Sequence, residues 1–250
     1  MPAPNLNVRR LARHLAYRAS VAADRLRGRS IVHMLHIGKT GGTAIKAAIN
    51  GAESPTHRVI KHGHDVSLAD LPEGDPFFFV VRDPVDRFVS GFKSRQRKGQ
   101  PRRYVEWRPS EKEAFERFDS AEALALGLSS FDEQTRDAAE RAFRHIGHVR
   151  DTYATWFGSW DALWQRRSDL VHALALERLD DDFDELKRKL SLPDDVSLPK
   201  DPVKAHRTTT PKPKLSETAA ANLARWYAAD YDFLDKCAEH FGTPHYDRPV

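Results

Sequence analysis

Residues Ile31 to Asn50 read IVHMLHIGKTGGTAIKAAIN, and this stretch decides the fold. Its first seven residues are mostly apolar or β-branched, as in a short buried strand. The residues from Thr43 onward have the alanine-rich composition of a helix. The pattern therefore predicts that a strand turns into a helix across residues 38–43, which read GKTGGT.

This strand-to-helix loop has the chemistry of an oxyanion site. Glycines allow successive backbone N–H groups to face one point, the helix N-terminus adds partial positive charge, and Lys39 adds a full charge. The standard nucleoside triphosphatase loop reads GxxxxGK[ST], but here its first glycine would fall on His33. We therefore expect a phosphate loop of another kind, in which the lysine precedes the glycine pair.

A second anion site is expected after the clearest predicted strand. The continuous apolar run at residues 76–81 is typical of a central strand covered on both faces. Asp83 and Pro84 suit the start of a helix, and apolar residues then recur with helical spacing. Arg82 and Ser90 would lie near the first loop, although Arg82 alone would be interpreted as a surface salt-bridge residue.

Strands and helices alternate along the rest of the chain. Short strands are predicted at residues 58–61 and 170–176, helices at 111–146 and 179–190, and a last helix from about residue 216. An aromatic stripe on one helical face is interpreted as core; its members are Tyr153, Trp156, Phe157, Trp160 and Trp164. The alternation predicts an α/β fold: a single P-loop-like domain with a central, mostly parallel sheet and helices on both faces.

Composition bounds the class of protein. Forty Lys+Arg against 36 Asp+Glu give a net charge of +4, too mild an excess to indicate nucleic acid binding. The single cysteine, Cys237, excludes an internal disulfide and a cysteine-based metal site. No apolar run approaches the roughly eighteen residues of a membrane span. We expect a cytoplasmic protein.

Residues 1–30 are predicted to form a basic helical arm, and residues 31–250 the main domain. The arm is rich in arginine and lacks the apolar core and cleavage site of a secretory signal. We interpret it as packed on the domain. Peripheral contact with anionic lipid, or with an acidic polymer, is the alternative.

Two further segments are rich in hydrogen-bond donors. Residues 93–108 combine basic side chains with Tyr104 and Trp107, which fits either a solvated helix end or the approach of an anionic or sugar-bearing substrate. Residues 191–214 are rich in proline and are predicted to form a long loop. Its centre, at residues 204–210, reads KAHRTTT.

The two anion sites together resemble those of sulfotransferases that use 3′-phosphoadenosine 5′-phosphosulfate (PAPS). Residues 36–43, HIGKTGGT, resemble the 5′-phosphosulfate loop of the carbohydrate, Golgi-type family, and residues 81–90, VRDPVDRFVS, resemble its 3′-phosphate site. KHGH at residues 61–64 resembles the His-Gly-His of members similar to heparan sulfate and uronyl 2-O-sulfotransferases. Residues 175–179 and 206–209 resemble the family's strand ending in Glu-Arg-Phe and its cofactor-covering loop.

The resemblance covers roughly residues 31–235 and implies a site residue by residue. PAPS and its product, 3′-phosphoadenosine 5′-phosphate (PAP), would contact Lys39, Thr40, Gly41, Gly42, Thr43, Arg82, Ser90, Arg207, Thr208 and Thr209. Residues 191–214 would cover the nucleotide. Lys39 would stabilise the departing phosphate, and no metal would be required.

The resemblance also implies the catalytic base. His64 would take the proton of an acceptor hydroxyl, with His62 as its helper; a reversal of these roles, or a carboxylate such as Asp65 or Glu177, is the alternative. If this segment stays extended, residues two apart point to the same side, so both histidines would face the crevice.

The implied reaction transfers a sulfuryl group from PAPS to a hydroxyl of a saccharide or glycolipid, which can itself be anionic. Gly38 departs from the family's usual proline, and Ala44 from its frequent serine. The absent membrane anchor of the animal enzymes favours a soluble bacterial member. Two rival functions remain: a P-loop-like nucleotide phosphotransferase, which would need the missing glycine and an acidic magnesium ligand, and a non-catalytic anionic-glycan-binding protein.

Overall fold

The computed structural model describes residues 18–101, 103–199 and 215–250, which are organised around a four-stranded sheet. The strand order is β2-β1-β3-β4, and every pairing is parallel. The strands are β1 (Ser30–Met34), β2 (His57–Lys61), β3 (Phe77–Val81) and β4 (Leu170–Ala175). The predicted α/β fold is confirmed, with a sheet that is wholly parallel within the described residues.

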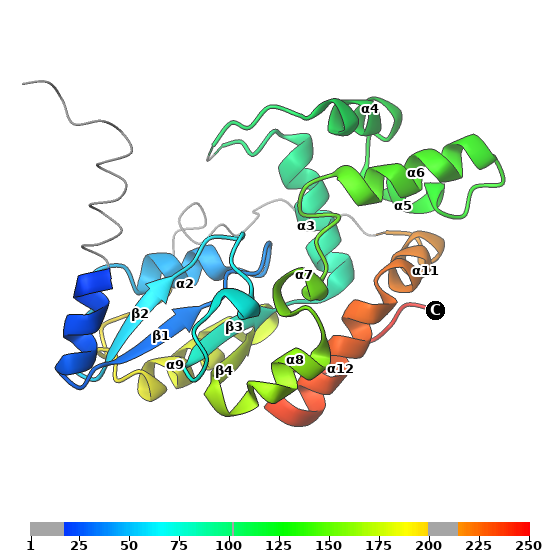
Figure 1. Ribbon diagram of the computed structural model, residues 1–250. Helices are drawn as coiled ribbons and strands as arrows, with labels where there is room; N and C mark the ends of the chain where they lie inside the picture. The colour runs from blue at the N-terminus through cyan, green and yellow to red at the C-terminus, as the bar shows by residue number, and fades with distance from the viewer. Residues whose placement is uncertain (1–17, 102, 200–214) are drawn as a thin grey trace, which may run out of the picture.

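Helices cover both faces of this sheet (Figure 1). One face carries α2 (Gly42–Ala48) and α9 (Leu179–Lys189). The other face carries α7 (Tyr153–Phe157), α8 (Trp160–Gln165) and α12 (Ala228–Phe241). Along β3, Phe78 and Val80 pack on the first side, and Phe77, Phe79 and Val81 pack on the second. Because alternate side chains of a strand point to opposite faces, covering both faces requires an unbroken apolar run.

A second group of helices packs around its own apolar cluster beside the sheet. Its members are α3 (Pro84–Gln96), α4 (Pro109–Arg117), α5 (Ala121–Gly127), α6 (Glu133–His145) and α11 (Glu217–Trp226). Figure 1 shows α4, α5 and α6 at the end of α3 that lies away from the sheet. The predicted start of α3 is confirmed: Pro84 occupies its first turn, and the Asp83 carboxylate accepts a hydrogen bond from the Asp86 N–H at 2.8 Å.

Two of the predicted helices are divided. The aromatic stripe spans α7 and α8, which are separated at Gly158, where φ is 71°. The interpretation as core holds for Tyr153, Trp156 and Phe157, which are buried. The last helix is also two helices, α11 and α12, which meet at Tyr227. The buried Tyr227 hydroxyl donates a hydrogen bond to the Val149 carbonyl at 2.6 Å, a contact that local periodicity does not encode.

The remaining described segments are short. Three single-turn 3₁₀ helices are η1 (Leu68–Asp70), η2 (Arg167–Asp169) and η3 (Leu176–Arg178). Residues 18–26 are helical and are tied to the sheet by the Asp24 carboxylate, which accepts hydrogen bonds from Arg58 at 2.5 Å and from Arg29 at 3.1 Å. Most of the predicted arm, and residues 200–214 with Arg207, Thr208 and Thr209, lie outside the described residues. No helix within the described ranges has the length and apolar character to cross a membrane.

Candidate active site

A cavity of about 900 Å³ lies where the two predicted anion sites meet. The chain runs from β1 outward to β2 at one edge of the sheet and from β3 outward to β4 at the other edge, so its direction across the sheet reverses between β1 and β3. Ligands of open parallel sheets bind at such a switch point, beyond the carboxyl ends of the strands. Lys39, Gly41, Gly42, Thr43, Arg82, Ser90 and His64 all line this cavity.

The glycine-rich loop lines the cavity, and its backbone packs very closely against neighbouring side chains. Gly41 has φ of 86°, and a Cβ there would lie 2.5 Å from Leu176 Cδ1. A Cβ at Gly42 would lie 2.6 Å from His36 Cδ2. Thr40 is buried, and its hydroxyl donates to the Ile37 carbonyl at 3.0 Å, so this side chain braces the turn. A side chain at position 41 or 42 would therefore collide with Leu176 or His36, so this path of the loop requires glycine at both positions.

Lys39 lies close to two other positively charged side chains, Arg82 and Arg97. It adopts φ of 68°, the left-handed region that only glycine enters freely. Burial, followed by the charges of Arg82 and Arg97, lowers the pKa of Lys39 to about 8. A bound anion would favour the charged form of this ammonium and raise its pKa again.

Arg82 is held firmly by its backbone and points its guanidinium toward the loop. The Tyr153 hydroxyl donates to the Arg82 carbonyl and accepts from the Arg82 N–H, both at 2.8 Å. Arg82 Nη1 donates to the Lys39 carbonyl at 3.0 Å, and Nη2 lies 4.0 Å from the Asp86 carboxylate. Arg82 Nε is buried without a hydrogen-bond partner among the described residues. This donor set is suited to an anion that the protein does not itself provide.

His64 faces the cavity with a defined tautomer. Its Nδ1 lies 2.9 Å from the His36 carbonyl oxygen. Because a carbonyl only accepts hydrogen bonds, Nδ1 carries the hydrogen, and the lone pair of Nε2 is left for another partner. The Trp156 Nε1–H donates to the His64 carbonyl at 3.0 Å and fixes the backbone. Desolvation lowers the pKa of His64, so the ring is neutral near pH 7.

His62 occupies a different environment. β2 ends at Lys61, so the segment does not continue as the extended strand that would place both histidines on one side. His62 Nε2 lies 2.8 Å from His33 Nδ1, and His33 Nε2 lies 3.1 Å from an Asp75 oxygen. Burial and the neighbouring His33 lower the pKa of His62 to about 4. His62 thus contacts the sheet and is not among the residues that line the cavity.

Comparison with known proteins agrees with this geometry. A sequence model described as the Sulfotransferase family matches residues 28–235. The chain belongs to the Sulfotransferase family. It is therefore a PAPS-dependent transferase, and PAPS is its donor. None of the curated proteins matches the chain.

The residues of this sulfotransferase fit such a donor. A nucleotide with phosphates at both ends needs close backbone approach and cations that are not neutralised by the protein. Gly41 and Gly42 line the cavity without side chains, the half-buried Lys39 provides an ammonium, and Arg82 provides a guanidinium whose Nη2 lies 4.0 Å from the Asp86 carboxylate. Ser90 adds a hydroxyl from α3. Which residues contact which phosphate stays a prediction.

The sulfotransferase cavity also contains residues that the motifs did not identify. His36 lies inside the quoted loop motif, and its Nδ1 is 2.7 Å from Lys46 Nζ. His148 follows α6 and comes from a segment with no motif of its own. Spacing could have suggested His36, but only the fold brings His148 to the cavity.

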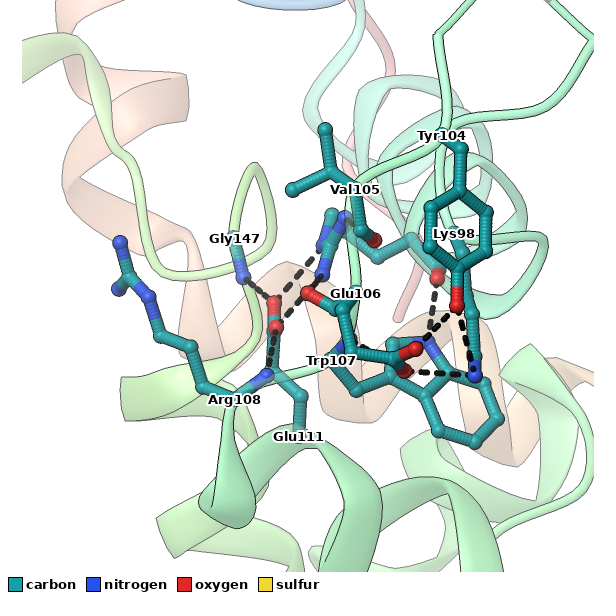
Figure 2. A network of polar contacts seen from close by, with 9 residues as sticks. Lys98, Tyr104, Val105, Glu106, Trp107, Arg108, Glu111 and Gly147 are labelled. Atoms are coloured by element: carbon teal, nitrogen blue, oxygen red, sulfur yellow. Dashed lines mark hydrogen bonds and ion pairs between the residues drawn. The ribbon is translucent and has the colours of Figure 1, made fainter.

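The basic stretch at residues 93–108 divides into two groups. Arg95 and Lys98 are structural: Arg95 donates to Glu111 at 2.6 and 2.8 Å, and Lys98 lies 2.6 Å from Glu106. Figure 2 shows Lys98 beside Tyr104, Glu106 and Trp107, and Lys98 Nζ is 4.6 Å from the centre of a Trp107 ring. The two aromatic residues therefore support the segment and are not among the residues that line the cavity, and a role for them in substrate binding stays a prediction.

The second group faces the cavity. Lys93, Arg97 and Arg103 line it, and none of them forms an ion pair with another described residue. These cations add to the positive charge of Lys39 and Arg82 in a cavity that is also lined by the carboxylates of Asp86, Glu177, Asp180 and Asp181. Within residues 18–101, 103–199 and 215–250, no group of three or more His, Cys, Asp or Glu could hold a metal ion, and metal independence stays a prediction.

Proposed function

We propose that this enzyme transfers the sulfuryl group to a hydroxyl of a saccharide or glycolipid, and that His64 is the base. The single observation that supports this most strongly is the hydrogen bond from His64 Nδ1 to the His36 carbonyl, at 2.9 Å. It leaves a neutral Nε2 lone pair at a cavity whose other wall carries Lys39 and Arg82. Similarity to the 2-O-sulfotransferases and a bacterial origin stay predictions.

The mechanism assigns one task to each group. PAPS, when bound, supplies an activated sulfuryl group. His64 Nε2 accepts the proton of the acceptor hydroxyl while the oxygen of that hydroxyl attacks. Lys39 and the backbone N–H groups of the loop neutralise charge on the departing phosphate oxygen. Arg82 and Ser90 would hold the 3′-phosphate, and His62, bonded to His33, would steady the segment that carries His64.

We further propose that the acceptor carries negative charge. Lys93, Arg97 and Arg103 line the cavity without anionic partners among the described residues. Such a wall attracts a carboxylate or sulfate and holds a charged saccharide better than a neutral one.

The deciding experiment measures transfer of labelled sulfate from PAPS to a panel of acceptors. The panel contains neutral and uronic-acid-containing oligosaccharides, glycolipids, phenols and aliphatic amines. We expect the acidic saccharides to be the best acceptors, with the preference weakening as salt is added. Transfer only to phenols or amines would contradict the proposal.

His64→Ala tests the base. We expect kcat to fall by about 10²–10⁴, the range of general-base catalysis, while the affinity for PAP in calorimetry stays within about twofold. His62→Ala, the matched control, should have the smaller effect because that ring contacts His33. Loss of turnover only in the His62 variant would exchange the two roles.

A further inference from the structure

A second histidine meets His64 at the cavity. His148 lies in the connection between α6 and α7, and its ring centroid is 5.8 Å from that of His64, edge to face. Both rings line the cavity. No sequence motif assigns a role to His148, and the proposed sulfuryl transfer gives it no task.

The backbone around His148 is shaped to bring this ring close. His148 is not a glycine, yet its φ is 65°. A Cβ at Gly91, beside Ser90 on α3, would lie 3.1 Å from the His148 Cβ and 3.3 Å from its carbonyl oxygen. A Cβ at Gly38 would lie 3.2 Å from His148 Nδ1. Unfavourable backbone angles persist where the surroundings enforce them, and they cluster at functional sites.

The two ring nitrogens of His148 differ in environment: Nδ1 is buried in the protein, and Nε2 remains for contacts in the cavity. Nδ1 is buried and has no hydrogen-bond partner among the described residues, and the Asp151 carboxylate is 4.0 Å away. The side chain nevertheless keeps 27% of its surface exposed. At 4.0 Å the Asp151 carboxylate is too far away to accept a hydrogen bond from Nδ1, and a buried N–H without a partner is rarer than a buried lone pair without one, so we assign the hydrogen to Nε2. Burial, followed by the charges of Lys39 and His64, lowers the pKa of His148 to about 4, which keeps the ring neutral near pH 7.

The two rings are therefore complementary. His64 uses Nδ1–H on the His36 carbonyl and offers a lone pair at Nε2, whereas His148, with an unpartnered buried Nδ1 and the hydrogen assigned to Nε2, would offer a donor. We propose that His148 is a second catalytic residue, whose Nε2–H donates a hydrogen bond to the acceptor oxygen while His64 removes the hydroxyl proton. The inference rests on the proposed function.

The proton balance of this step is simple. The O–H bond of the acceptor breaks, its proton moves to His64 Nε2, and the oxygen keeps the electron pair with which it attacks. His148 keeps its own proton. Its hydrogen bond orients the oxygen and favours loss of the proton by stabilising the charge that develops there.

Two variants separate the ring nitrogen from the backbone role. The amide nitrogen of His148→Gln can reach the place of Nε2, whereas that of His148→Asn reaches only the place of Nδ1. Asparagine tolerates positive φ better than glutamine, so the Asn variant is the better match for the backbone. If His148 has only a structural role, His148→Asn should be the more active variant. If Nε2 donates a hydrogen bond, His148→Gln should be the more active one.

The kinetic readout is transfer of labelled sulfate from PAPS to the best saccharide of the acceptor panel, with hydrolysis of PAPS by water measured as the background. We expect His148→Asn to lose at least about tenfold in turnover and His148→Gln to keep a third or more, while both bind PAP like the wild type. Equal turnover in the two variants, high or low, would overturn the proposal. Failure of the wild type to bind PAP, or to transfer sulfate to any saccharide or glycolipid of the panel, would instead overturn the proposed function.

A second readout needs no turnover. Nuclear magnetic resonance of ring nitrogens in histidine-labelled wild type, assigned with His148→Gln and His64→Gln, reports the tautomers at pH 7. We expect hydrogen on Nε2 of His148 and on Nδ1 of His64. Hydrogen on Nδ1 of His148, or a charged His148 ring at that pH, would overturn the proposal.

Discussion

Arg82 combines a rigid backbone with an incompletely satisfied guanidinium. The Tyr153 hydroxyl forms hydrogen bonds with both the N–H and the carbonyl of Arg82, each at 2.8 Å. Arg82 Nε is buried without a hydrogen-bond partner within the described residues. The guanidinium is therefore held beside the glycine-rich loop with part of its hydrogen-bonding capacity unused. Such preorganisation makes one charged contact selective for the ligand that supplies the matching phosphate.

Arg82→Ala should distinguish PAP from AMP. Loss of a charge-assisted hydrogen bond costs about 1.5–3 kcal/mol, so we expect PAP to bind about tenfold to a hundredfold more weakly. AMP lacks the 3′-phosphate and should bind nearly as before. Isothermal titration with both nucleotides measures this, with ATP as a further comparison, and equal losses for PAP and AMP would remove Arg82 from the 3′-phosphate site.

Lys39 should couple nucleotide binding to proton uptake. Its pKa is lowered to about 8 in the free protein, and a bound phosphate raises the pKa, so about half a proton should be taken up per PAP at pH 8. PAP affinity should therefore weaken as the pH rises above 8. Calorimetry in two buffers of different ionisation enthalpy measures the uptake.

Lys39→Arg is the matched control, because arginine stays charged throughout this range. The variant should lose the proton uptake that belongs to Lys39 and leave only the contribution of PAP itself. An uptake that is the same in both proteins would assign the proton to another group.

Helices α3 and α12 are joined by a buried ion pair. Arg87 Nη2 lies 2.7 Å from an Asp230 oxygen, and both side chains are 2% exposed. The other Asp230 oxygen accepts from the Tyr153 N–H at 2.8 Å, so the pair also supports the residue that holds Arg82. The helical group and the sheet are thereby connected directly behind the site.

Asp230→Asn should destabilise the protein strongly. It leaves the Arg87 charge buried without compensation, which typically costs about 3–5 kcal/mol. We expect a lower urea midpoint, with an unfolding slope that does not change.

Combining Asp230→Asn with Arg87→Met tests this explanation. The double variant contains no buried unpaired charge, so it should be more stable than Asp230→Asn alone. If the two substitutions simply added, the buried charge would not be the cause.

The stability of the protein should depend on several histidines that are held neutral. The pKa values of His62 and His148 are lowered to about 4, mainly by burial, and burial also lowers those of His33 and His172. Between pH 6.5 and pH 4 the unfolded chain therefore binds more protons than the native protein does. Stability is fully present above pH 6.5 and falls as the pH decreases through this window.

Thermal unfolding should reveal this dependence. We expect the Tm to fall by about 5 °C or more between pH 7 and pH 5. His62→Gln removes one of the groups and should give a shallower decrease. A Tm that stays level or rises over this interval would contradict the neutral state of the buried rings.

Local patterns were sufficient to predict much of the fold and one half of the cavity. The strand period of two, the helical spacing and the glycine-rich loop place β1, β3, α2 and α3 correctly, because each depends on neighbouring residues. Both anion sites belong to these elements, so Lys39 and Arg82 could be named together. The division at Tyr227 was not predicted; the hydroxyl of this residue donates to the Val149 carbonyl, a partner far away in the chain that local spacing does not indicate.

Only tertiary contacts decided the other half of the cavity. The KHGH motif contains two histidines whose roles the sequence cannot distinguish. In the fold, His62 forms a hydrogen bond with His33 and His64 forms one with the His36 carbonyl, so the two rings lie in different environments. The basic stretch offers many cations, but Glu106 and Glu111 neutralise Lys98 and Arg95 and leave Arg97 at the cavity. His148 reaches the site because the connection between α6 and α7 packs against Gly91 of α3. Hydrogen-bond partners and close packing depend on where distant segments meet, and residue spacing within one segment does not contain that information.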